Sequence, residues 1–248
     1  MAKFNRLGEE VSEIMLDTNI ISNLMRLKNE TTKKIFEKVA MENSKYLQHY
    51  WETTYLYRAF KQELEEEYFF KAKKVSLLIS NVVLREVSNA NMAFAKYKDC
   101  GEEITKYRNS MVNGLRSFDI NISQLLNRDR ELFEYVVNLI KGQNPDFSEF
   151  NFSAIKPSSV KDILICAHAI IENKPLVTQD NHFIGGNNEH RNEICKRINV
   201  AKEKIQQKFG VELNTPKIQT VPEFLKEHYV EIYSQYVSTM KRANEMNI

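Results

Sequence analysis

The chain has 248 residues, of which 42% are hydrophobic and 27% are charged, an ordinary globular composition. This length suffices for one large domain or two small ones and for a sizeable core. The formal net charge of +2 excludes a chain that is strongly basic throughout, so a nucleic-acid partner would require a local basic surface.

Cysteine usage and hydropathy indicate the cellular setting. The three cysteines, Cys100, Cys166 and Cys195, are odd in number and widely spaced, which argues against a disulfide framework or a zinc knuckle. We interpret them as free thiols of a reducing compartment. The first residues, MAKFNRLGEEVSEIM, lack the apolar core of a signal peptide, and no run approaches the roughly 20 apolar residues of a membrane helix. We therefore expect a soluble cytoplasmic protein without a membrane partner.

Several common enzyme motifs are absent from the sequence. It contains neither GxGxxG nor GxxxxGK[ST], so phosphate-cradling nucleotide loops are not expected. It also lacks HExxH, and its histidines are scattered. No repeat, low-complexity tract or Pro/Gly/Ser linker divides the chain. We predict one elaborated domain over residues 1–248.

The stretch IMLDTNIISNLM predicts the first strand and the first helix. Ile14–Leu16 is a short apolar run that suits a buried strand, and residues 19–27 are apolar at helical spacing. Asp17 lies between the two elements. Asp17 or Thr18 could simply cap the helix, since both residue types are common N-caps. The alternative is a ligand site, because open parallel sheets bind ligands where their strands end.

The remaining elements continue the alternation of helix and strand. Val75–Ile79 predicts a second strand, after which Ser80 can cap a helix over residues 81–95. LVT at Leu176–Thr178 predicts a third strand, and KIQTV, followed by Pro222 in the first turn of the last helix, predicts a fourth. Further helices are predicted over residues 31–41, 48–74, 102–116, 128–140 and 160–172. This order indicates an α/β fold with a parallel sheet.

Four acidic residues occupy comparable positions in the strand–helix pattern: Asp17, Glu86, Asp162 and Asp180. Asp17 and Asp180 follow predicted strands, Glu86 lies two turns into the helix after the second strand, and Asp162 lies in the first turn of the helix that leads into the third strand. Right-handed crossovers bring the ends of parallel strands to one edge, where these side chains could converge. Each also has a simpler interpretation. Asp17 could be a cap, Glu86 a solvated helix residue and Asp180 a turn residue. Asp162 could form a capping box with Ser159.

Three segments resemble the successive motifs of the PIN-domain nucleases: LDTN (Leu16–Asn19), LLISNVVLREV (Leu77–Val87) and SSVKDILICAHAIIENKPLVTQDNHF (Ser158–Phe183). The ending KIQTVPEFLKEH is similar to the last strand and helix of that family. The resemblance implies a three-layer α/β/α fold with a short central parallel sheet. The chain is longer than compact members of the family, with helical insertions at approximately residues 30–74 and 100–150 and a basic extension at residues 184–215.

The resemblance also implies a metal site. Carried over residue by residue, the catalytic and metal-binding acids are Asp17, Glu86, Asp162 and Asp180, with Thr18, Asn19, Ser80 and Thr178 as supporting residues. Carboxylates held close together require protonation or a cation. Ligands that are all oxygen favour Mg²⁺ or Mn²⁺ over Zn²⁺. Such a metal would activate water and neutralise charge on a scissile phosphate.

A polyanionic substrate also requires positive charge. The segment RNEICKRINVAKEKIQQK carries six basic and two acidic residues, so its RNA-binding candidates are Arg191, Lys196, Arg197, Lys202, Lys204 and Lys208. Lys71, Lys73 and Lys74 form a second basic cluster, and His182 is close enough to Asp180 in sequence to contact a substrate. For each basic segment the alternative is a solvated helix.

These features favour a divalent-metal-dependent endoribonuclease, similar to the toxin ribonucleases of toxin–antitoxin pairs or to enzymes of RNA processing. Such an enzyme would take RNA as its substrate. An antitoxin, another protein partner and a homodimer all stay open. The alternatives are a structure-specific DNA nuclease and a non-catalytic RNA-binding or scaffold protein with the same fold.

Overall fold

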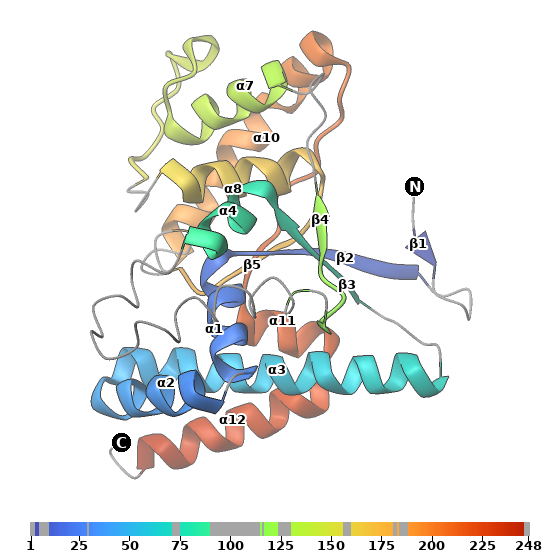
Figure 1. Ribbon diagram of the computed structural model, residues 1–248. Helices are drawn as coiled ribbons and strands as arrows, with labels where there is room; N and C mark the ends of the chain where they lie inside the picture. The colour runs from blue at the N-terminus through green and yellow to red at the C-terminus, as the bar shows by residue number, and fades with distance from the viewer. Residues whose placement is uncertain are drawn as a thin grey trace.

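The computed structural model describes residues 3–4, 10–28, 30–70, 75–89, 115, 117–123, 130–155, 160–180, 183 and 188–245. At its centre, five parallel strands form a sheet in the order β4-β3-β2-β5-β6, and the short β1 pairs antiparallel with β2 (Figure 1). The strands are β1 Lys3–Phe4, β2 Glu10–Leu16, β3 Val75–Ser80, β4 Asn121–Ser123, β5 Leu176–Thr178 and β6 Ile218–Thr220.

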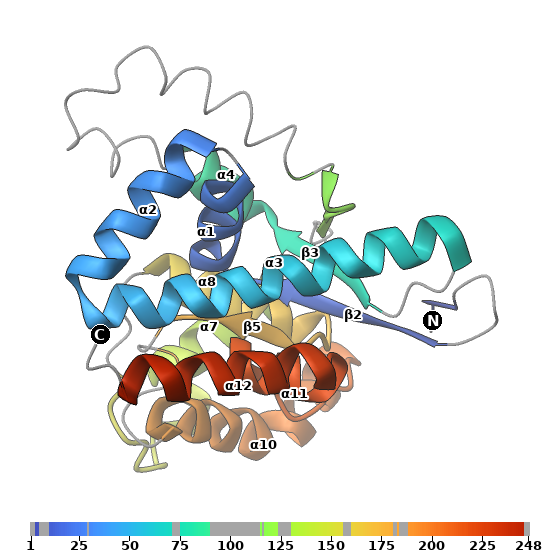
Figure 2. The same ribbon diagram turned by 90° about the horizontal axis from the view of Figure 1, so that it is seen from below.

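Helices cover both faces of this sheet, so the predicted three-layer α/β/α fold is confirmed. One face carries α7, α8 and α10, and the other carries α1, α2, α3, α11 and α12 (Figure 1). Figure 2 shows α3 running beneath the sheet beside α11 and α12, both of which it contacts. The helices are α1 Thr18–Lys28, α2 Glu30–Glu42, α3 Ser44–Phe70, α4 Asn81–Asn89, α7 Arg130–Lys141, the 3₁₀ turn η2 Pro145–Phe147, α8 Val160–Ile171, α10 Glu189–Phe209, α11 Val221–His228 and α12 Val230–Glu245.

The central strands are apolar because both of their faces are covered. Every residue of β3 and of β5 is buried, as are the last three residues of β2, Ile14–Leu16. Leu16 pairs with Val177, and Leu176 pairs with Ile218. Short apolar runs of this kind are what predicted these strands in the sequence. Within the described residues, no helix has the combination of length and apolarity that crossing a membrane requires.

Some elements differ from the sequence predictions. β4 consists of Asn121, Ile122 and Ser123 and is largely exposed, so it has no apolar run and only its pairing with β3 defines it. The single helix predicted after Pro222 is two helices, because Tyr229 between α11 and α12 has a non-helical backbone (φ −141°, ψ 62°). The predicted helical residues 71–74 and 90–95, and nearly all of 102–116, lie outside the described residues.

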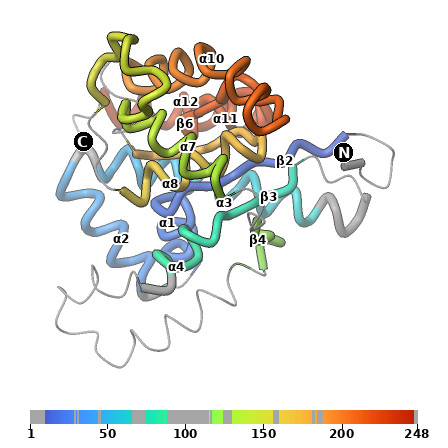
Figure 3. The backbone as a smooth tube through the Cα atoms, turned by 90° about the horizontal axis from the view of Figure 1, so that it is seen from above, coloured from blue at the N-terminus to red at the C-terminus, as the bar shows by residue number. Residues whose placement is uncertain are grey.

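The order of the strands places a switch in topology between β2 and β5. From β2, the sheet continues through β3 to β4 on one side and through β5 to β6 on the other. Ligands of open α/β sheets bind in the crevice outside the carboxyl ends of strands at such a point. α1 and α4 begin at this edge, and α8, which leads back to the start of β5, begins there as well. α4 contacts both α1 and α8, and the three helices lie beside one another in Figure 3.

Candidate active site

Asp17 joins the first strand to the first helix and to the neighbouring strand. Its backbone N–H extends the sheet by donating to the carbonyl of Val177 (3.1 Å). Its side chain is 1% exposed. Oδ1 accepts from the N–H of Thr18 (2.6 Å), and Oδ2 accepts from the hydroxyl of Thr178 (2.7 Å). Asp17 therefore occupies the N-cap position of α1, but its Oδ2 accepts a hydrogen bond from Thr178 at the end of β5.

Thr178 connects Asp17 to Asp180. The hydroxyl that donates to Asp17 also accepts from the backbone N–H of Asp180 (2.9 Å). Thr178 is fully buried at the end of β5, so neither bond is open to competition from water. The predicted supporting role of Thr178 thus has a geometric basis, since one hydroxyl orients one acid and the backbone of another.

Glu86 reaches the same group from α4. The hydroxyl of Thr18 donates to its Oε2, so Thr18 contacts Asp17 through its backbone and Glu86 through its side chain. The other oxygen of Glu86, Oε1, is 3.0 Å from Nζ of Lys161. Lys161 directly precedes Asp162 in the first turn of α8. α1 and α4 therefore each bring a predicted residue to the group, Thr18 and Glu86, and α8 adds Lys161.

The charges of two other predicted acids, Asp162 and Asp180, act on Asp17. The pKa of Asp17 is raised to about 7, mainly by burial and to a smaller extent by the charges of Asp162 and Asp180. The hydrogen bonds from Thr178 and Thr18 act in the opposite direction, because they stabilise the carboxylate. Asp17 is therefore a buried acid with two like charges near it.

The chemistry of the side chains fits a hard divalent cation such as Mg²⁺ or Mn²⁺, because all four candidate ligands are carboxylates. Bound here, such a cation would relieve the repulsion between them. In the described part of the chain, however, no three His, Cys, Asp or Glu side chains are already gathered as a metal site. The carboxylates of Asp17 and Glu86 are bonded to Thr18, Thr178 and Lys161 instead. The carboxylates are therefore the right type of ligand for such a cation, but within the described residues they are not already arranged around a common metal position.

The other supporting residues differ in their positions. Ser80 is fully buried and caps α4, with its hydroxyl accepting from the N–H of Val83 (3.2 Å). Asn19 is exposed in the first turn of α1. His182 and Ser159 lie outside the described residues.

Gln179 is a buried site residue that the sequence did not reveal. Its Oε1 accepts from the side chain of Asn23 on α1 (3.0 Å). Its Nε2 donates to the carboxylate of Glu52 (3.0 Å) and to the hydroxyl of Thr53 (3.3 Å), both on α3. Gln179 thereby ties the segment between Thr178 and Asp180 to two helices. Its position between those residues was the only local signal, because its partners are distant in sequence.

Two of the six predicted RNA-binding residues on α10, Arg191 and Arg197, are committed to contacts within the fold. Arg197 is 2% exposed, so the structure argues against its predicted contact with RNA. Its guanidinium donates to Glu193 (3.1 Å) and to the carbonyls of Leu139, Ile140 and Ser153. Arg191 forms a paired contact with Glu223 (2.7 and 3.0 Å) and donates to the carbonyl of Ile218. Lys202 donates to the hydroxyl of Thr215 (2.9 Å).

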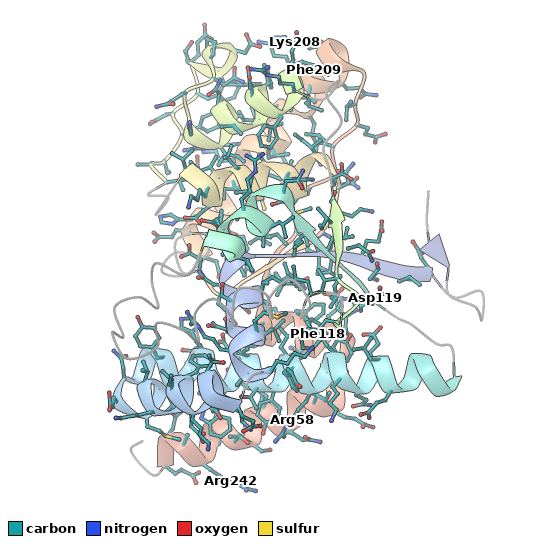
Figure 4. All side chains as sticks on the ribbon, viewed as in Figure 1. Arg58, Phe118, Asp119, Lys208, Phe209 and Arg242 are labelled. Atoms are coloured by element: carbon teal, nitrogen blue, oxygen red, sulfur yellow. The ribbon has the colours of Figure 1, made fainter. Side chains whose placement is uncertain are left out.

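The other three candidates, Lys196, Lys204 and Lys208, have side chains that are about half exposed. Each lies over an aromatic ring: Phe152, Phe147, and both Tyr135 and Phe209, respectively. Lys208 and Phe209 lie at the outer end of α10, well away from the sheet (Figure 4). Lys71, Lys73 and Lys74 lie outside the described residues.

Comparison with protein-family models found no match to this chain, and neither did searches of curated proteins and of solved structures.

Proposed function

We propose that this protein is a divalent-metal-dependent endoribonuclease of the PIN type. The observation that carries the proposal is the hydrogen-bonded connection of Asp17, Thr178 and Asp180 at the switch point of the sheet. Burying an acid beside two like charges destabilises a fold, and a cation that binds there relieves the repulsion. The order of the sequence motifs supports the same function.

In this proposal the four acids, Asp17, Glu86, Asp162 and Asp180, hold Mg²⁺ or Mn²⁺. Bound there, the cation would lower the pKa of a water molecule and neutralise charge on the scissile phosphate. Thr178 keeps Asp17 oriented, and Thr18 holds both Asp17 and Glu86. Side chains held in this way lose little freedom when a ligand binds, which is the usual value of residues that orient metal ligands.

The choice of substrate rests on the resemblance of the sequence motifs. RNA is favoured by the resemblance, with a toxin or an RNA-processing enzyme as the two settings. A structure-specific DNA nuclease would use the same acids, and a scaffold protein would not use them catalytically. The three alternatives differ in what they cleave, so one assay separates them.

The test is incubation of the protein with single-stranded RNA, single-stranded DNA and branched DNA, each with Mn²⁺ and with EDTA. We expect internal cleavage of RNA that depends on Mn²⁺ and is lost in the Asp17→Asn/Asp180→Asn double variant. Asp119→Asn is the matched control. Asp119 lies before β4, at the opposite end of the sheet (Figure 4), and its positive φ of 49° is one that Asn adopts readily.

Cleavage of branched DNA alone would favour the DNA nuclease. RNA binding without cleavage of any substrate would favour the scaffold protein. Cleavage that survives in the double variant would remove the acids from the mechanism.

A further inference from the structure

Lys161 brings a positive charge to the acids at the carboxyl edge of the sheet. Its Nζ lies 3.0 Å from Oε1 of Glu86, which joins the first turn of α8 to α4. The two partners differ in exposure, because the side chain of Lys161 is 59% exposed and that of Glu86 is 17% exposed. The carboxylate is therefore held in the site, while the lysine reaches it from solvent.

The two oxygens of Glu86 have partners of different kinds. Oε2 accepts from the hydroxyl of Thr18, whose backbone N–H donates to Asp17, so this side of Glu86 is fixed to the rest of the group. Oε1 faces the ammonium group of a solvent-exposed lysine side chain. An ion pair with one exposed partner contributes little to stability. A cation that takes Glu86 as a ligand can therefore replace the lysine without breaking the Thr18 bond.

We infer that Lys161 alternates between Glu86 and a phosphate group of the RNA substrate. Without metal, its ammonium group neutralises Glu86 and limits repulsion among the acids. With metal on the carboxylates, the ammonium group is released beside the site and binds a phosphate oxygen of the bound RNA. Lysine suits this role, because its ammonium is a compact point charge on a flexible stem and a common phosphate ligand. The inference rests on the proposed function.

This role predicts opposite effects of one substitution. Lys161→Met keeps the aliphatic stem and removes the charge. Metal affinity should rise, because a cation no longer competes with the lysine for Glu86. RNA cleavage at low substrate concentration should fall, because a phosphate contact is lost. A lysine that only holds α8 against α4 would lower both quantities when removed.

The experiment measures both quantities on the same proteins. Mn²⁺ affinity is measured by calorimetry without RNA, and single-turnover cleavage of a 5′-labelled single-stranded RNA is measured at several salt concentrations. For Lys161→Met we expect Mn²⁺ binding about two- to fivefold tighter, the range of an exposed ion pair. Cleavage below saturation should be slower, with the salt slope reduced by about 0.7, the value for one phosphate contact on a single strand.

Two variants complete the design. Lys61→Met is the matched control, because Lys61 forms an exposed ion pair with Glu65 on α3 (3.8 Å), and it should change neither quantity. Lys161→Arg should restore the salt slope. A wild-type protein that neither binds Mn²⁺ nor cleaves RNA would overturn the proposed function itself. If the wild-type protein does both, unchanged or weaker Mn²⁺ binding by Lys161→Met would overturn the alternating role of Lys161, as would an unchanged salt slope.

Discussion

At the carboxyl edge of the sheet, Asp17 is buried beside two other acids, whereas in the layer of α7 and α10 the buried Arg197 is surrounded by acceptors. Arg197 pairs with Glu193 one turn away and donates to three carbonyls, so its charge is compensated within the fold. At the edge, the pKa of Asp17 is raised to about 7, mainly by burial and less by the neighbouring acids.

The charge of Arg197 therefore contributes to the structure, whereas the charge of Asp17 costs stability. A buried charge with a full set of partners can be retained for structure alone. A buried carboxylate near like charges costs stability, so its presence requires another explanation. This contrast is the physical reason for proposing the carboxyl edge of the sheet, rather than α10, as the functional site.

Replacing Arg197 should cause the largest loss of stability. Arg197→Met removes the buried partner of Glu193, and breaking a buried pair costs about 3–5 kcal/mol of unfolding free energy. Urea denaturation measures the loss. Lys196→Met, at the next residue, is the control, because its side chain is 54% exposed and 4.0 Å from the same glutamate. Equal stability of the Arg197→Met and Lys196→Met variants would contradict a structural role for Arg197.

His168 tests burial without neighbouring like charges. Burial lowers the pKa of His168 from 6.5 to about 4, and its Nε2 is 3.1 Å from the hydroxyl of Ser123. The unfolded state therefore binds the proton more tightly, so stability should fall as the pH drops from about 6.5 to 4, by about 2–3 kcal/mol. His168→Gln keeps an N–H near Ser123 and should remove this part of the pH dependence. Parallel pH profiles for both proteins in urea denaturation would contradict the prediction.

Thr178 tests whether the bridge between Asp17 and Asp180 matters to the metal. Thr178→Val keeps the shape and removes the hydroxyl, so Mn²⁺ affinity should fall about 10–100-fold, as for other residues that orient metal ligands. Thr178→Ser should keep most of the affinity. Calorimetry measures both variants. Equal Mn²⁺ affinity in the valine and serine variants would show that the bridge is structural only.

Replacing the exposed lysines of α10 should change stability least. Replacing Lys196, Lys204 and Lys208 by Gln should change stability by less than about 1 kcal/mol each. If they contact RNA, each substitution should reduce the salt slope of RNA binding by about 0.7. Because Lys208 lies far from the sheet edge (Figure 4), the cleavage rate of bound RNA should not change. An unchanged salt slope in the triple variant would leave these lysines as a solvated helix surface.

The strands that consist of short apolar runs could be predicted from the sequence. β3 and β5 match the predicted strands to within one residue, and the strand order places Asp17 and Asp180 at neighbouring strand ends. β4 could not be predicted in this way, because Asn121–Ser123 has no apolar run and forms only by pairing with β3.

Long-range partners explain what the sequence did not reveal. Gln179 is joined to Glu52, which is 127 residues away, and no local pattern indicates that pairing. For Arg197 a signal was present, since Glu193 precedes it by one helical turn. The spacing of the acids predicted their meeting at one edge, while the ion pair of Lys161 with Glu86 depends on how α4 and α8 pack.

Asp17 decides the central claim, because a helix cap and a metal ligand respond differently to Asp17→Asn. Asn caps a helix about as well as Asp, so a cap alone predicts no change. The raised pKa of about 7 means that the folded state holds the proton more tightly than the unfolded state. Without metal, stability should therefore decrease as the pH rises from about 4 to 7. Asn at this position removes that cost, by about 2–4 kcal/mol above pH 7.

The most direct measurement pairs RNA cleavage in Mn²⁺ with thermal melting in EDTA at pH 5 and pH 8, for the wild-type protein and Asp17→Asn. We predict that cleavage falls at least about 100-fold, beyond the range for residues that only orient ligands. The variant should melt at an equal or higher temperature than the wild-type protein, with the larger gain at pH 8. Undiminished cleavage with unchanged melting at both pH values would contradict the account and return Asp17 to the role of a helix cap.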